Sequence, residues 1–197
     1  QHAELAQLLA AVHCERGDAQ SLDKALAELA DTSRELLERG HALQAARLLN
    51  DQAAVYMKMG DPVRAVALLG QSREVFEQRP PNDPVTVREL AETNHLLARI
   101  LLRVPPKPGR EADALASGVD HAMAAGRAYE RLGDAHSRGR VLETLGRIEL
   151  ARGNVEVAVT RLQTALDEQQ RILDLVGLAR TTAAMSDALL AAGKTEQ

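Results

Sequence analysis

A glycine followed by a polar residue recurs at long, regular intervals along this chain. The pairs are Gly17-Asp18, Gly60-Asp61, Gly153-Asn154 and Gly193-Lys194. Their glycines lie 43, 93 and 40 residues apart, and the midpoint of the longest interval falls in the proline-rich stretch 104–109. Glycine commonly ends a helix in the left-handed conformation, and Asp or Asn caps the helix that follows. The pattern therefore predicts repeated units of about 40–46 residues, each made of two helices.

The composition favours helices throughout. Aromatic residues make up only 2% of the chain and Trp is absent, whereas Ala and Leu, which favour helices, are abundant. A β-sandwich or barrel would need Val, Ile, Tyr and Phe on alternating positions. We therefore expect an all-α chain, with amphipathic helices over 2–16, 21–39, 41–59, 62–79, 85–103, 110–132, 135–152, 155–173 and 175–192.

Small residues recur at equivalent positions of the predicted helices, where they allow close packing. Ala53, Ala98 and Gly146 lie on first helices of their units, and Ala65 and Ala158 lie on second helices. These features predict an α-solenoid of antiparallel helical hairpins, a single repeat domain over 1–197. Its units cover 1–40, 41–84, 85–133, 134–174 and, as a half unit, 175–197. Because the chain opens on Gln1 rather than Met, we expect it to be a piece of a longer protein.

Two units carry a pattern of packing residues that resembles the tetratricopeptide repeat (TPR) family. Unit four has Leu142, Leu145-Gly146, Ala158, Leu162 and Ala165, and unit two has Leu49, Ala53, Tyr56, Ala65, Leu69 and Ser72. The length of the units is similar to the roughly 42-residue variety of bacterial regulatory and signalling proteins and motor light-chain adaptors. The resemblance implies a TPR-like superhelix whose first helices line a concave groove that contacts ligands.

Several functional classes lack the residues they need. The net charge of −4 and the scarcity of aromatic side chains argue against nucleic-acid binding, and no apolar run approaches the length of a membrane span. The six histidines are scattered, and no strand precedes the glycines at 133, 139 and 146, so neither a metal site nor a phosphate-binding loop is predicted. We expect no catalytic site and no cofactor. The single cysteine, Cys14, fits a reducing, cytoplasmic setting.

The first helices carry charged and polar residues, chiefly arginine, at positions expected to face the groove. The predicted partner-binding residues are Arg47, Asn50, His95, Arg99, Arg140, Glu143, Arg147 and Arg180, with Glu92 and Arg103 on or near the same face. A row of guanidinium groups binds carboxylates, which indicates an acidic partner segment. In the alternative interpretation these arginines pair with Glu92, Glu143 and their neighbours and form a solvated inner surface.

Two functions follow from this arrangement. In the first, the chain is a protein–protein interaction scaffold that binds a peptide segment or partner domain, or docks against an effector domain of the same protein. In the second, it is a ligand-sensing regulatory domain whose superhelical pitch changes when a peptide or small molecule binds. A sensor needs an enclosed pocket lined by apolar groups, whereas a scaffold needs only an open groove. The scarcity of aromatic residues favours the open groove.

Overall fold

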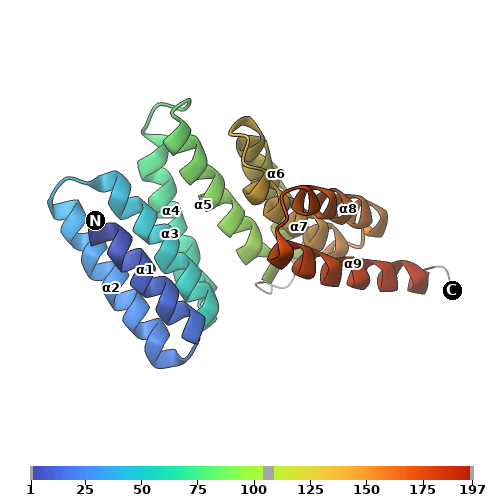
Figure 1. Cartoon of the computed structure of the whole chain (residues 1–197), viewed down its shortest axis with the longest axis horizontal. Helices are drawn as coiled ribbons and strands as arrows, with labels where there is room; N and C mark the ends of the chain where they lie inside the picture. Colours follow the sequence, from blue (N-terminus) through green and yellow to red (C-terminus); the bar gives the residue numbers. More distant parts are fainter. Residues whose placement is uncertain (1, 104–108, 196–197) are drawn as a thin grey trace. The chain divides into compact units, whose positions relative to one another are not determined.

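The computed structural model describes residues 2–103 and 109–195, and all regular structure within these ranges is helical (Figure 1). The helices are α1 (His2–Arg16), α2 (Ala19–Glu38), α3 (Ala42–Met59), α4 (Pro62–Glu77), α5 (Pro84–Arg103), α6 (Glu111–Arg131), α7 (Ala135–Ala151), α8 (Val155–Arg171) and α9 (Leu175–Thr195). The all-α prediction is confirmed for the described residues, and each helix end lies within three residues of its predicted place. The proline-rich turn predicted at 104–108 lies outside the described residues.

The turn between α3 and α4 illustrates how the glycine-polar signal works. Gly60 adopts a φ of +77°, which ends α3. The backbone N–H of Asp61 donates to the carbonyl of Tyr56 at 2.9 Å. The side chain of Asp61 then accepts a hydrogen bond from the backbone N–H of Arg64 at 3.1 Å and so caps α4. One glycine and one carboxylate thus satisfy backbone groups of both helices.

Two turn signals behave differently from this pattern. The turn predicted at Gly193 is wrong, because α9 continues through this residue to Thr195. Gly193 follows two alanines, which favour a helix, and Lys194 cannot cap a new helix as Asp or Asn does. Between α8 and α9 the left-handed position is held by Leu173, with a φ of 57°, whereas glycine holds it at Gly17, Gly40, Gly60, Gly133 and Gly153. This leucine side chain is 78% exposed.

The contacts within the chain define two units, residues 1–96 and 97–197, which divide inside α5. In unit 1, helices α1 to α4 pack one after another along the chain, and α1 also contacts α3. In unit 2, α6 to α9 pack in the same sequential manner, and α7 also contacts α9. Within each unit, successive helices therefore pack on one another, and first helices of neighbouring hairpins also touch, as in an α-solenoid.

The core of unit 2 confirms the close packing predicted for small residues. Ala158 and Leu162 of α8 are fully buried, and they face Gly146 of α7. A Cβ atom added to Gly146 would lie 2.5 Å from Cγ of Leu162 and 3.3 Å from the carbonyl oxygen of Ala158. Only glycine allows the two helices to approach this closely.

Candidate functional site

The face shared by α7 and α9 in unit 2 carries a stripe of charged side chains. Arg140, Glu143 and Arg147 lie three and four residues apart, so they lie on one side of α7. Arg180 comes from α9, which packs against α7. We call Arg140, Glu143, Arg147 and Arg180 the α7–α9 arginine face. The structure thus brings together four of the eight residues predicted from the sequence.

Glu143 holds two of these arginines in place. Its carboxylate is largely buried, and its two oxygens lie 3.2 Å from Nε of Arg147 and 3.4 Å from Nε of Arg180. Arg147 also donates from Nη2 to the carbonyl oxygen of Arg180 at 3.3 Å. The side chains of Arg147 and Arg180 remain 39% and 46% exposed. Two guanidinium groups are therefore fixed across the α7–α9 contact and remain open to solvent.

Arg140 lies one turn before Glu143 and is half-buried. Within residues 2–103 and 109–195 it has no ion-pair partner. The α7–α9 arginine face therefore holds three guanidinium groups and one carboxylate. Guanidinium groups bind carboxylates through two parallel hydrogen bonds, so this excess of positive charge suits an anionic ligand group.

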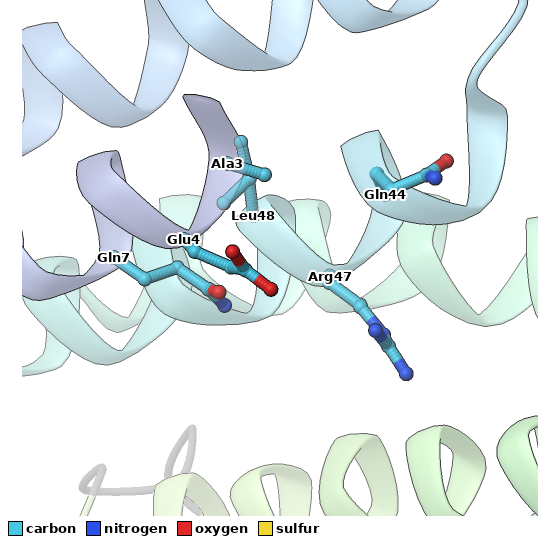
Figure 2. Close-up of a pocket in the computed structure, with 6 residues that line it drawn as sticks. All are labelled: Ala3, Glu4, Gln7, Gln44, Arg47 and Leu48. Atoms are coloured by element: carbon cyan, nitrogen blue, oxygen red, sulfur yellow. The ribbon is translucent and has the colours of Figure 1, made fainter. Parts of the chain in front are cut away.

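Arg47 has a different environment, on the face formed by α1, α3 and α5 in unit 1. Its Nε lies 2.6 Å from Oε1 of Glu89, whose side chain is only 14% exposed. Beside it lies a pocket of about 210 Å³, with Glu4 and Gln7 projecting from α1 and Gln44 and Arg47 from α3 (Figure 2). This pocket is smaller than the roughly 300–1,000 Å³ that small-molecule sites usually occupy.

Carboxylates outnumber guanidinium groups around Arg47. Asp51 accepts a hydrogen bond from Nε2 of Gln7 at 2.6 Å, and burial raises the pKa of Asp51 above its ordinary value despite this bond. Burial likewise raises the pKa of Glu89, against the opposing effect of Arg47. Glu92 contributes to both pKa shifts by repulsion. This face of unit 1 therefore presents an acidic surface.

Asn50 and His95 are buried, with exposed fractions of 4% and 2%. Nδ2 of Asn50 donates to Oγ1 of Thr93 at 3.0 Å, and the Thr93 hydroxyl donates to the carbonyl oxygen of Glu89 at 2.9 Å. This buried polar contact joins α3 to α5. Arg99 lies one turn after His95 on α5 and is half-buried.

The sequence interpretation missed the carboxylates nearest to Arg47. Glu89 lies three residues before Glu92 on α5, so a helical projection places both on one side of that helix. This three-residue spacing could have identified Glu89 from the sequence as a neighbour of Glu92 on the same face. No comparable signal exists for Asp51, because its burial depends on how α1 packs over α3.

Other kinds of site were sought in the same described ranges. There, no group of three or more His, Cys, Asp or Glu side chains could hold a metal ion. None of the described helices is sufficiently long and apolar to cross a membrane. Cys14 is half-buried, and this burial raises the pKa of its thiol. A thiol that stays protonated is a weak nucleophile.

The fold is that of TPR-like helical repeat proteins. The chain is similar to the crystal structure of a kinesin light chain-like protein from Podosopora anserina with nearly identical TPR-like repeats. That match has a TM-score of 0.67 and 16% sequence identity over 100% of this chain and 90% of the other. A point variant of the same protein gives a TM-score of 0.69 and 17% identity over the same shares. No family model and no curated protein matches the sequence.

Proposed function

We propose that this chain is a protein-interaction module that binds an acidic segment of a partner on the α7–α9 arginine face. The observation that carries the proposal is the excess of cationic groups there. Arg147 and Arg180 share a single carboxylate, that of Glu143, and Arg140 has no ion pair within the described part of the chain. Because Glu143 already orients two guanidinium groups, a partner carboxylate meets groups that lose little conformational entropy on binding.

The acidic segment belongs either to a second protein or to an effector domain of the same protein. We place the module in the cytoplasm, as part of a bacterial-type regulatory or signalling protein. The single cysteine and the resemblance of the long repeat to such proteins support this placement. The alternative, a ligand-sensing domain, has weaker support, because the pocket beside Arg47 is small and carries charged groups of both signs.

The test measures binding of a fluorescein-labelled peptide that alternates Glu and Gly, with a Lys–Gly peptide as the reversed-charge probe. We expect the chain to bind the acidic peptide, and the double variant Arg140→Glu/Arg147→Glu to bind about a hundredfold more weakly at low salt. Fluorescence anisotropy gives both affinities. Circular dichroism should show little change in folding, because these arginines are partly exposed.

A matched control uses two arginines on α8. Arg161 and Arg171 are exposed, so Arg161→Glu/Arg171→Glu changes the net charge by the same amount away from the α7–α9 arginine face. This control should keep most of the affinity for the acidic peptide. If both double variants lose affinity equally, the attraction comes from overall charge, and the proposed site is wrong. Stronger binding of the Lys–Gly peptide would contradict the acidic partner.

A further inference from the structure

The guanidinium groups of the α7–α9 arginine face lie at two separate positions along α7. Arg147 and Arg180 form one position, because Nε of each faces a different oxygen of the Glu143 carboxylate, at 3.2 and 3.4 Å. Arg140 forms the other position, seven residues before Arg147. Seven residues are two helical turns, so the two positions lie on the same side of α7 and about 10 Å apart along its axis.

The charge of this face calls for two anionic groups on the partner. Its side chains are three arginines and one glutamate, so two positive charges remain after Glu143 is counted. A carboxylate that accepts two parallel hydrogen bonds from one guanidinium group occupies one of the two positions and cannot also reach the other. Two separate acidic side chains are therefore needed to neutralise the face.

The residues beyond these two positions do not extend the row of arginines. One turn before Arg140 stands His136, whose Nδ1 lies 3.3 Å from Oδ2 of Asp174. One turn after Arg147 stands Ala151, the last residue of α7. Along α7, all of which the structure describes, this side of the helix therefore offers two arginine positions and no third.

We propose that the partner segment lies along α7 in an extended polyproline II conformation and carries two acidic residues with two other residues between them. This inference rests on the proposed function and specifies the partner further. A polyproline II chain rises about 3.1 Å per residue and completes a turn every three residues. Residues i and i+3 therefore lie on the same side, about 9 Å apart, close to the separation of the two arginine positions.

Other backbone conformations of the partner fit this separation less well. In a β-strand, side chains on one side are about 7 Å apart at i and i+2 and about 13 Å apart at i and i+4. In an α-helix, residues i and i+7 match the separation, but a short isolated helix is unstable in water. Polyproline II is already a major conformer of unfolded chains, so a segment in this conformation loses less entropy on binding.

The first experiment compares three fluorescein-labelled peptides of equal charge, in which two glutamates are separated by one, two or three prolines. All three carry the same flanking prolines and blocked ends, so they share the polyproline II conformation. Their glutamates are about 6, 9 and 12 Å apart along the axis, and only the two-proline peptide has both glutamates on one side. By fluorescence anisotropy at low salt, we expect this peptide to bind at least about tenfold more tightly than the other two.

The second experiment removes one of the two arginine positions. Arg140→Gln should lower the affinity of the two-proline peptide at least about tenfold, to the level of the other two peptides, because only one position remains. The affinities of the other two peptides should change little, since each of them engages one position at a time. Arg161→Gln is the matched control, because it removes the same charge from the exposed side of α8 and should preserve the preference for two prolines.

Three results would overturn the inference. They are equal affinities of the wild-type chain for the three peptides, a preference for two prolines that persists in Arg140→Gln, and tighter binding of a helical alanine-based peptide with glutamates at i and i+7. The proposed function has a separate outcome. It stands if the Glu–Gly peptide loses affinity for Arg140→Glu/Arg147→Glu while the three proline peptides bind equally well. It fails, together with this inference, if no acidic peptide binds.

Discussion

Replacing Gly146 by alanine tests whether α7 and α8 pack as tightly as the structure indicates. The new Cβ would lie 2.5 Å from Cγ and 2.7 Å from Cδ2 of Leu162, well inside contact distance. Leu162 is fully buried and cannot move away into solvent. The carbonyl oxygen of Ala158, at 3.3 Å from the same point, blocks the other direction. The two helices must therefore separate or distort.

The expected change in the free energy of unfolding of Gly146→Ala follows from two opposing effects. Alanine favours a helix over glycine by about 1 kcal/mol, whereas forcing an extra methyl group into a packed core costs about 1–3 kcal/mol. Gly126→Ala on α6 is the matched control, because its new Cβ would meet only Cγ1 of Val141 at an ordinary 3.5 Å. We expect Gly126→Ala to stabilise unit 2 by up to about 1 kcal/mol. Gly146→Ala should be less stable than this control by about 2 kcal/mol.

Urea unfolding measures this difference, provided that the signal comes from unit 2. The chain has two tyrosines, Tyr56 in unit 1 and Tyr129 in unit 2, and no tryptophan. In a Tyr56→Phe background, the fluorescence of the buried Tyr129 reports unit 2 alone. If Gly146→Ala and Gly126→Ala have equal free energies of unfolding, the α7–α8 contact is looser than described, and the reasoning fails.

Three further changes have defined outcomes. Ala158→Phe should lower the free energy of unfolding by about 1–3 kcal/mol or more in the same assay, because this side chain is fully buried. Leu173→Gly should raise the free energy of unfolding by about 0.5–1 kcal/mol, because glycine adopts a positive φ without strain. Gly153→Leu in the preceding turn should lower the free energy of unfolding, because it forces a leucine into a positive φ. The pKa of Asp51 is raised in the folded chain, so its carboxyl group binds a proton more tightly there than in the unfolded chain. The free energy of unfolding should therefore fall as pH rises from about 4 through the raised pKa. Asp51→Asn should weaken this pH dependence and increase stability at pH 7, as measured by urea unfolding at several pH values.

The backbone arrangement was predictable because its determinants are local. The turn at Gly60-Asp61 needs only a residue that tolerates a positive φ and a carboxylate one position later. The packing of Gly146 on Leu162 was also accessible, because the two residues belong to one hairpin and repeat the pattern of unit two. The left-handed conformation of Leu173 could not be predicted in this way, because a leucine in the sequence gives no indication of a positive φ.

The side-chain partners were harder to predict, because they depend on which polar side chains become buried when the helices pack. Glu149 stands where the repeat pattern has an aromatic residue, and the sequence alone gives it no role. In the structure it is buried, and it accepts hydrogen bonds from Nδ2 of Asn154 at 2.6 Å and Nη1 of Arg152 at 3.0 Å. It therefore fixes the turn between α7 and α8. The burial of Asn50 likewise depends on Thr93, which belongs to the next hairpin.

Comparison of equivalent positions explains why Arg140 has no ion pair within the described residues whereas Arg47 has one. Arg47 and Asn50 align with Arg140 and Glu143, which lie 93 residues further along the chain. Asn50 contacts Thr93 on the next first helix, and Glu143 contacts Arg180 on its own next first helix. Glu89, the partner of Arg47, lies six residues after the capping residue Asp83, and the residue six positions after the capping residue Asp174 is Arg180. A second guanidinium group therefore stands on α9 where Arg47 meets a carboxylate on α5.

This substitution of a carboxylate by a guanidinium group leads to a last prediction. Arg180→Glu should supply Arg140 with a carboxylate partner and compete with the acidic peptide, which lowers its affinity about tenfold more than Arg180→Gln does at low salt. Arg180→Gln is the control, since it removes the same guanidinium group and glutamine has nearly the shape of glutamate without its charge. Fluorescence anisotropy measures both affinities. Equal affinities for the two variants would mean that Arg140 takes no part in binding.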